Sequence, residues 1–296
     1  MGTVWEIDFY SRPLVDENQK KRWELLVCES PLSVRRSPDT LFRYAQYCPS
    51  DTVNSEWLAQ ALRDAIDRAP APPSIIRFFR RQMNNTIVRA SKELGIDARL
   101  GRRTFALHQW LAERLKTVYP LDPGYQASAL SSPSVRYQPQ APQPLPDALE
   151  GQKWAFATLS AEDFADLPDW DIDFGESFPL ELFSIESDTR IPGVIIFSPR
   201  AFPLAAWLSG LELDFLKFAA TPSPQLLLET GADTRWILAN VTGDRTLSEA
   251  RGFESFKQAA CGVHFLAIQT NPETESFAGF WLLSELDLAD GNRSSG

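Results

Sequence analysis

Basic side chains gather in one short part of an otherwise acidic chain. The 296 residues carry a formal charge of −10, yet residues 74–117 hold 10 Lys and Arg against 3 Asp and Glu. Guanidinium groups bind phosphate through paired hydrogen bonds, and a local field acts over about 8–10 Å whatever the charge elsewhere. We therefore take this segment as the candidate binding site for a nucleic acid or another phosphate-bearing ligand. Its candidate residues are Arg77, Arg80, Arg81, Asn84, Asn85, Arg89, Lys92, Arg99, Arg102 and Arg103.

Two arginine pairs fall where a predicted strand ends and a helix begins. Arg80 and Arg81 precede one predicted helix, and Arg102 and Arg103 precede the next. Cations are unfavourable at the positive amino end of a helix unless an anion binds there. If both junctions lay at one edge of the sheet, they would form a basic groove with no carboxylates to neutralise it. The alternative is that these arginines pair with acids of the C-terminal half.

Amides and aromatic rings near this segment have two interpretations each. Asn84 and Asn85 are weak helix formers that would bond base edges or sugar hydroxyls, or simply face water. Aromatic residues on the first two strands could stack on unpaired bases, but on a hairpin such residues more often form the core or cross-strand pairs. They are Trp5, Phe9, Tyr10 and Trp23.

Few residues suggest catalysis. Asp8 and Glu24 on paired strands could hold Mg²⁺ in a divergent nuclease, although no Lys stands two positions after Glu24. His108 and His264 are flanked by apolar residues without a nucleophile motif, and the three cysteines lack metal-ligand spacing. No phosphate-binding glycine motif is present. We expect no catalytic residue, no metal and no cofactor, and hence a protein that is not an enzyme.

The elements that must position these residues are read from periodicity. Residues 1–118 predict an N-terminal basic α+β domain in the order β-β-β-α-β-α-β-α. One of its helices buries Met83, Ile87, Ala90 and Leu94 on one face and ends at Gly95. The predicted strands are 3–12, 20–29, 39–48, 74–79 and 95–100, and the predicted helices are 54–69, 81–95 and 103–119.

A proline-rich stretch separates this domain from a second one. Residues 119–151 contain seven prolines without helical or strand periodicity, which is typical of a linker. Residues 152–290 predict an acidic C-terminal α+β domain, and 291–296 a tail. The acidic residues there, such as those of 169–176, suit either solvation or a basic partner. No apolar run approaches the roughly 20 residues needed for membrane insertion.

The order of motifs resembles the RNA-binding translation-activator family of cyanobacteria and chloroplasts that supports synthesis of photosystem reaction-centre subunits. The resemblance is collinear and covers nearly the whole chain. Its N-terminal motifs are "WEIDFYSRPLVDENQKKRWELLVC", "IRFFRRQMNNTI" and "WLAERLKTVYPLDPGY"; the C-terminal ones include "IPGVIIFSPRAFPLAAWLSGLEL", "ACGVHFLAIQ" and "GFWLLSEL".

The resemblance implies binding to the 5′ untranslated region of a photosystem mRNA, chiefly of photosystem I, and support of its translation. We expect single-stranded or looped RNA on the N-terminal domain and a protein partner on the acidic C-terminal domain. With no signal or transit peptide evident at the N-terminus, we expect a cyanobacterial, cytoplasmic protein. The alternatives are a photosystem assembly factor that acts through protein contacts without binding RNA, and the metal-dependent nuclease.

Overall fold

The computed structural model describes residues 2–127, 140–146, 149, 151, 153–231 and 233–285. It divides the chain into two compact units. Among the described residues, the N-terminal unit comprises 2–30 and 39–127, and the C-terminal unit comprises 31–38 and those from 140 onward. Both units mix helices with sheets, which confirms the α+β class. No helix of the described residues is long and apolar enough to span a membrane.

The N-terminal unit is built on a five-stranded sheet in the order β3-β2-β1-β4-β5. β1, β2 and β3 are antiparallel neighbours, whereas β4 runs parallel to both β1 and β5. The predicted order β-β-β-α-β-α-β-α is confirmed. Its elements are β1 (Thr3–Val15), β2 (Lys21–Glu29), β3 (Arg43–Cys48), α1 (Ser55–Arg68), β4 (Pro73–Phe78), α2 (Asn84–Glu93), β5 (Asp97–Leu100) and α3 (Phe105–Thr117).

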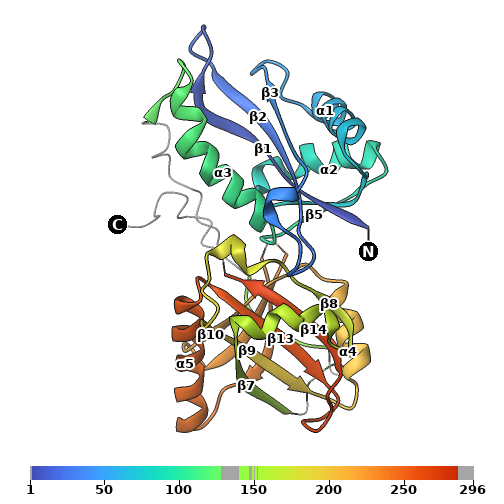
Figure 1. Ribbon diagram of the computed structural model, residues 1–296, viewed down its shortest axis with the longest axis vertical. Helices are drawn as coiled ribbons and strands as arrows, with labels where there is room; N and C mark the ends of the chain where they lie inside the picture. The colour runs from blue at the N-terminus through green and yellow to red at the C-terminus, as the bar shows by residue number, and fades with distance from the viewer. Residues whose placement is uncertain are drawn as a thin grey trace. The chain divides into compact units, whose positions relative to one another are not determined.

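Strand alternation gives this sheet one apolar face and one charged face. Trp5, Ile7 and Phe9 of β1 lie in the apolar core with side chains of α1 and α2. The intervening Glu6 and Asp8 are also buried. α3 covers their face, since the Leu107 N–H donates a hydrogen bond to Glu6 Oε2 at 2.8 Å. Figure 1 shows α3 on one side of the sheet and α1 and α2 on the other.

Local signals explain where the helices of this unit begin and end. The Asn54 side chain accepts a hydrogen bond from Trp57 N at 2.8 Å and caps α1. Before α2, residues Arg81–Met83 form a short 3-10 turn, η2. Gly95 follows α2 with φ of 72°, a conformation that glycine adopts without strain.

The C-terminal unit contains two sheets, with an apolar core between them that includes residues of α4 and α5. One sheet has the order β7-β9-β13-β14-β8, and the other β10-β11-β12-β6. The first comprises β7 (Lys153–Ser160), β9 (Arg190–Phe197), β13 (Val263–Gln269), β14 (Phe277–Ser284) and β8 (Ile172–Glu176). The second comprises β10 (Leu213–Ala219), β11 (Gln225–Thr230), β12 (Thr234–Asn240) and β6 (Gln143–Pro144). The helices are α4 (Ala201–Ser209) and α5 (Asp244–Ala259), and the 3-10 segments η6 (Ala161–Asp169) and η7 (Leu180–Phe183).

The proline-rich stretch is structured where its ends are described. At its start, η3 (Tyr119–Leu121) buries Tyr119, and the Val15 N–H donates to the Gly124 carbonyl at 2.9 Å. At its other end, β6 pairs with β12. These ends therefore pack onto the two units, and they are not free linker. Residues 128–139 of the predicted linker and 291–296 of the predicted tail lie outside the described residues.

Candidate nucleic-acid interface

The two arginine pairs lie at the same edge of the N-terminal sheet. β4 and β5 are adjacent and parallel, with Phe78 opposite Leu100, so their carboxyl ends meet at one edge. Arg80 and Arg81 follow β4, and residues 102–103 follow β5. The topology that the basic groove requires is thus present. Ligands often bind beyond the carboxyl ends of parallel strands in open sheets.

Arg80, however, is held by a carboxylate. Its Nε donates a hydrogen bond to Asp8 Oδ1 at 2.6 Å, and its Nη2 donates to Oδ2 at 3.2 Å. The guanidinium also lies 4.0 Å from the centre of the Tyr10 ring. The expectation that the helix-end arginines lack carboxylate neighbours is therefore wrong for Arg80. Asp8 belongs to the same unit, so the alternative of pairing with acids of the C-terminal half does not describe Arg80 either.

Asp8 is part of a buried network of charges beneath α3. Arg12 donates hydrogen bonds to Asp8 Oδ2 at 2.7 Å and to Glu24 Oε2 at 2.9 Å. Tyr119 Oη donates to Glu24 Oε2 at 2.6 Å, and Arg114 donates to Glu24 Oε1. A buried charge is tolerated only when it is paired and hydrogen-bonded, and this network meets that condition.

The network shifts the acidity of its members. Burial by itself raises the pKa of Asp8, but the charges of Arg80 and Arg12 and their hydrogen bonds outweigh burial and lower it to about 2. Burial, with the Glu24 carboxylate nearby, raises the pKa of Tyr119 despite the opposing charge of Arg12. Asp8 is thus a carboxylate and Tyr119 a neutral phenol throughout the physiological range.

This network argues against the nuclease alternative. Asp8 and Glu24 do lie near one another, as that alternative requires. Their oxygens accept hydrogen bonds from arginines and Tyr119, and the positive charge that a metal would supply is already present as Arg12 between them. The described part of the chain brings no three His, Cys, Asp or Glu side chains together as a metal site.

Burial also sets apart two further candidates. Arg77 on β4 is 5% exposed, and Arg103 is 3% exposed. Both make interactions within the protein. A side chain that is this buried cannot contact a phosphate of an RNA backbone unless the surrounding structure moves. We assign Arg77 and Arg103 to the support of the site and not to its surface.

An exposed basic stripe remains on α2 and its preceding turn. Arg81, Asn85, Arg89 and Lys92 are all exposed and stand at successive intervals of four, four and three residues. Side chains at such intervals share one face of a helix. The opposite face is buried at Met83, Ile87 and Ala90, as the sequence predicts. We call these four exposed residues the α2 stripe.

The remaining candidates lie around this stripe in partly buried positions. Asn84 is half-buried, and its Nδ2 donates to Asn85 Oδ1 at 3.3 Å. Arg99 Nε donates to Asp97 Oδ2 at 2.7 Å in a partly exposed ion pair. Arg102 is half-buried, whereas Arg81 of the stripe is exposed; both interact within the protein. These side chains are therefore less available to a ligand than the α2 stripe is.

The aromatic residues of the first two strands form core and not a base-stacking platform. Trp5 and Phe9 are fully buried. The Phe9 ring stacks on Trp57 of α1 with centroids 5.4 Å apart. Tyr10 and Trp23 pack against the same core with their rings 5.5 Å apart. The core interpretation that the sequence favoured is confirmed.

Comparison with known proteins identifies the family. A model of the N-terminal domain of RNA-binding protein Tab2/Atab2 matches residues 4–114, and a model of the C-terminal domain of the same protein matches 132–284. The chain belongs to the Tab2/Atab2 family. The N-terminal Tab2/Atab2 match contains the whole α2 stripe, the buried charge network except Tyr119, and both arginine pairs.

Two plant members of the Tab2/Atab2 family are similar along nearly the whole chain. The chloroplastic TAB2 homologue of Zea mays is 38% identical over 289 residues, which cover 95% of this chain and 71% of that protein. The chloroplastic TAB2 homologue of Arabidopsis thaliana is 39% identical over 290 residues, covering 95% and 74%. The resemblance drawn from the sequence motifs is therefore confirmed.

The charge network beneath α3 is a feature that the sequence analysis missed. Arg12 lies outside the candidate segment 74–117. Arg114 lies within it but is not among the candidate residues. A signal was present, because Glu6, Asp8 and Arg12 alternate with apolar residues along one strand. Charged residues at strand spacing usually face water, so only the position of α3 reveals that this face is covered.

Proposed function

We propose that this protein binds RNA through the α2 stripe and supports translation of a photosystem mRNA by contacting its 5′ untranslated region. It acts as a binding protein and not as an enzyme, in the cytosol of a cyanobacterium. Family membership supports RNA as the ligand, and the resemblance to translation activators favours a photosystem I message. The observation that carries the site is the exposed helical spacing of Arg81, Asn85, Arg89 and Lys92.

The charge distribution around the stripe supports this assignment. No Asp or Glu lies between Asp67 and Glu93 in the sequence, whereas six Lys and Arg do. Glu93 at the end of α2 pairs with Arg63 at 2.5 Å, which offsets its negative charge locally. Phosphates bound along this face would gain from Arg89 and Lys92 and meet little repulsion. Asn85 adds an amide that can donate to and accept from a base edge or a 2′-hydroxyl.

Single-stranded or looped RNA suits this surface better than duplex RNA. One helix face with three cations and an amide contacts a few nucleotides, and sequence-specific proteins generally read RNA where its bases are unpaired. The buried network beneath α3 then has a supporting role, since it fixes the strand ends from which η2 and α2 start.

A protein partner of the C-terminal unit is the second part of the proposal. Residues 118–296 hold 25 Asp and Glu against 10 Lys and Arg, which disfavours RNA there and suits a basic polypeptide. If the protein were instead a photosystem assembly factor that does not bind RNA, binding of a protein partner by the C-terminal unit would be sufficient for its function.

Crosslinking in cells tests the function directly. Ultraviolet crosslinking of the tagged protein, followed by sequencing of the bound transcripts, should enrich the 5′ untranslated regions of photosystem I mRNAs. Mass spectrometry of crosslinked peptides should place the adducts within residues 81–92. Transcripts bound without preference would contradict the proposed target, and adducts confined to the C-terminal unit would contradict the proposed site. A protein with no crosslinked RNA would favour the assembly-factor alternative.

A further inference from the structure

We propose that the C-terminal unit holds a binding pocket for an arginine or lysine side chain presented by a basic segment of a partner protein. This inference rests on the protein-partner part of the proposed function and supplies its site. It does not depend on RNA binding by the N-terminal unit.

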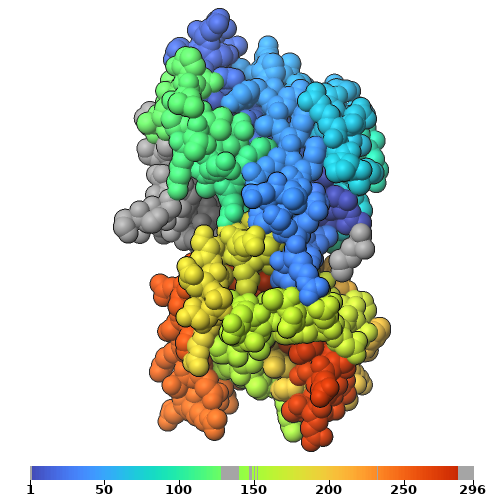
Figure 2. Space-filling model, viewed as in Figure 1, coloured from blue at the N-terminus to red at the C-terminus, as the bar shows by residue number. Residues whose placement is uncertain are grey.

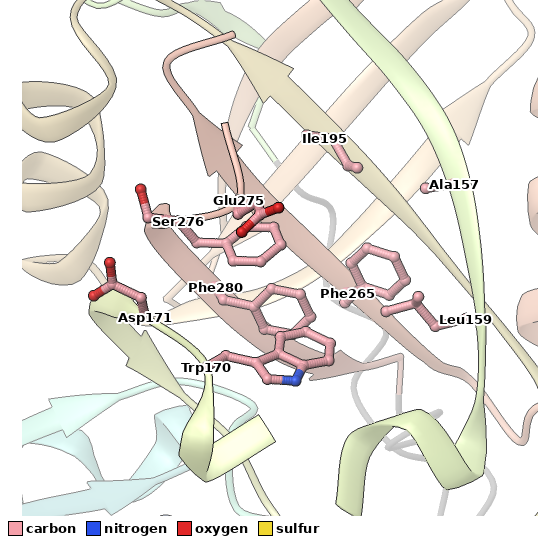
Figure 3. A pocket seen from close by; sticks show the side chains of 10 residues that line it. Ala157, Leu159, Trp170, Asp171, Ile195, Phe265, Glu275, Ser276 and Phe280 are labelled. Atoms are coloured by element: carbon pink, nitrogen blue, oxygen red, sulfur yellow. The ribbon is translucent and has the colours of Figure 1, made fainter. Parts of the chain in front are cut away.

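The pocket lies against the first sheet of the C-terminal unit and has a volume of about 480 Å³. Aromatic rings form much of its wall. Phe265 on β13 and Phe280 on β14 stack with centroids 5.3 Å apart, and Trp170 meets Phe280 edge-on at 5.4 Å. Trp170 also stacks on Phe277 at 5.7 Å. Figure 3 shows the rings of Trp170, Phe280 and Phe265 as a continuous row.

The pocket lies on the face of the sheet that is opposite the main apolar core. Val194 and Ile196 of β9 are buried in the core with α4 and α5, whereas Ile195 between them lines the pocket. Gly193 lies opposite Phe265 in the neighbouring strand. A Cβ at this glycine would stand 2.3 Å from the Phe265 ring. The missing side chain therefore lets the ring lie flat across β9 and form the floor of the pocket.

Carboxylates stand at one end of the aromatic row. Asp171 and Glu275 line the pocket and are exposed, and Ser276 also lines it. In Figure 3 the three polar residues gather at one end, and Leu159, Ala157 and Ile195 lie at the other. Within the described part of the chain, neither Asp171 nor Glu275 forms an ion pair. A cation that enters here meets negative charge at the mouth and the partly exposed rings of Trp170 and Phe277, which the buried rings of Phe265 and Phe280 support.

This combination selects for a cation with an apolar stem. Ring faces attract ammonium and guanidinium groups, and more strongly where water is excluded. A volume of this size is in the range of ligand pockets and accommodates a basic side chain together with an apolar neighbour. A nucleobase would also stack on the rings, but its phosphate would be repelled by the carboxylates of Asp171 and Glu275 that line the pocket.

The surrounding charge indicates a polypeptide and not a small free cation. From residue 154 to residue 189 the chain has ten Asp and Glu and no Lys, Arg or His. Several of these acids are exposed on η6 and β8 beside the pocket, among them Glu162, Asp166 and Asp173. Figure 2 shows η6, in lime green, at the surface of this unit. Arg35 offsets one of these acids, because its Nη2 pairs with Asp169 Oδ2 at 2.5 Å. The remaining acids match several positive charges on one polypeptide better than a single small ion.

Binding of matched peptides tests the proposal. The probe is a short fluorescein-labelled peptide of alternating arginine and leucine, and its control has citrulline in place of every arginine, which keeps the shape and removes the charge. The full-length protein should bind the arginine peptide at least about tenfold more tightly than the citrulline peptide at low ionic strength.

Variants of the protein locate the peptide. Asp171→Asn/Glu275→Gln should weaken the arginine peptide about tenfold, and Phe277→Leu, which keeps an apolar group without a ring, about fivefold. Asp244→Asn/Glu249→Gln is the matched control, since it removes two charges from α5, whose buried residues lie in the core on the opposite face of the sheet. It should leave the affinity nearly unchanged.

Two results would overturn the pocket. Equal binding of the arginine and citrulline peptides would show that no cation is selected. Equal weakening by the two charge-removing double variants would show that only the general acidity of the unit attracts the peptide. RNA affinity should be unaffected by Phe277→Leu, so loss of the pocket and loss of the RNA site are separate outcomes.

Discussion

Arg80 donates two hydrogen bonds to the buried Asp8, from Nε to Oδ1 at 2.6 Å and from Nη2 to Oδ2 at 3.2 Å. The Asp8 side chain is fully buried, and that of Arg80 is 23% exposed. The pair joins β1 to the segment that leads from β4 into α2. Arg80 therefore holds the base of the proposed RNA-binding helix and has little freedom to bind phosphate itself.

Arg80→Ala should destabilise the N-terminal unit and leave RNA affinity nearly unchanged. Removing one partner of a buried pair leaves a charge incompletely compensated, although Arg12 remains beside Asp8. We expect a loss of about 2 kcal/mol in the free energy of unfolding, measured by urea denaturation. Arg63→Ala is the control, because it breaks an exposed pair with Glu93 and should cost no more than about 0.5 kcal/mol. Equal effects of the two substitutions would contradict a structural role for Arg80.

The Asp8 pKa makes part of this stability dependent on pH. The ordinary pKa of 3.8 applies in the unfolded chain, and the folded value is about 2. A lowered pKa stabilises the folded state above pH 4, and this contribution, about 2 kcal/mol, is lost as the pH falls from 4 toward 2. Carbon-detected NMR titration should show the Asp8 carboxyl group still mostly ionised at pH 3. A midpoint near 4 would mean that the arginines do not stabilise the carboxylate.

Arg80 and Arg81 show which features of the candidate site can be predicted from the sequence and which cannot. Periodicity predicted the strand before these residues, the helix after them and the buried face at Met83 and Ile87. It also predicted that each arginine pair stands between a strand and a helix, whereas the shared sheet edge of the two junctions comes from the structure. It could not separate two adjacent arginines, because the carboxylate that holds Arg80 lies 72 positions earlier in the chain. Long-range pairing of this kind is set by strand order, which local pattern does not encode.

His264 should stay neutral well below its usual titration range. It is fully buried, its Nδ1 bonds the Gly262 carbonyl at 2.8 Å, and its Nε2 accepts a hydrogen bond from Leu216 N at 2.8 Å. Burial, together with the nearby charge of Lys257, lowers its pKa well below the ordinary value of 6.5. Below pH 6.5 His264 is protonated in the unfolded chain but stays neutral in the folded chain. The free energy of unfolding should therefore fall as the pH drops below 6.5.

The slope of this fall approaches about 1.4 kcal/mol per pH unit for one histidine. His108, whose pKa burial also lowers, adds a contribution of the same sign. Denaturation between pH 7.5 and 5 should therefore show a shallower slope in His264→Gln, whose amide does not titrate in this range. An unchanged slope would mean that His264 takes up its proton equally in the folded and unfolded states.

Gly193 and Gly252 should respond in opposite directions to alanine. At Gly193 the new methyl group would overlap the Phe265 ring at 2.3 Å, and overpacking of this kind costs about 1–3 kcal/mol. At Gly252, on α5, a Cβ meets nothing within 4 Å, and alanine should stabilise the helix by about 0.5–1 kcal/mol. Thermal denaturation of the two variants measures both effects. A tolerated Gly193→Ala would show that the Phe265 ring is not confined as described.

The C-terminal unit shows the same limit of sequence reading. The sequence predicts an α+β domain for residues 152–290, and the unit does mix helices with sheets. The acidic residues of 169–176 indicate an exposed surface and not a strand. The structure nevertheless places the strand β8 (Ile172–Glu176) within this stretch. Aspartates at every second position mask the strand pattern, because β8 is an edge strand with one exposed side. The sequence does not predict the aromatic pocket either, because its rings come from residues that are far apart in the chain, namely 170, 265, 277 and 280.

The salt dependence of RNA affinity tests the α2 stripe most directly. The triple variant Arg81→Ala/Arg89→Ala/Lys92→Ala should lose affinity, and the slope of log affinity against log salt should fall in magnitude by about 2, or about 0.7 for each phosphate contact removed. Lys153→Ala/Arg245→Ala/Arg251→Ala removes the same charge from exposed positions of the C-terminal unit and should leave the slope unchanged. If the α2 triple variant kept the wild-type slope, or if the two variants lost the same amount, RNA would not be bound by this helix face.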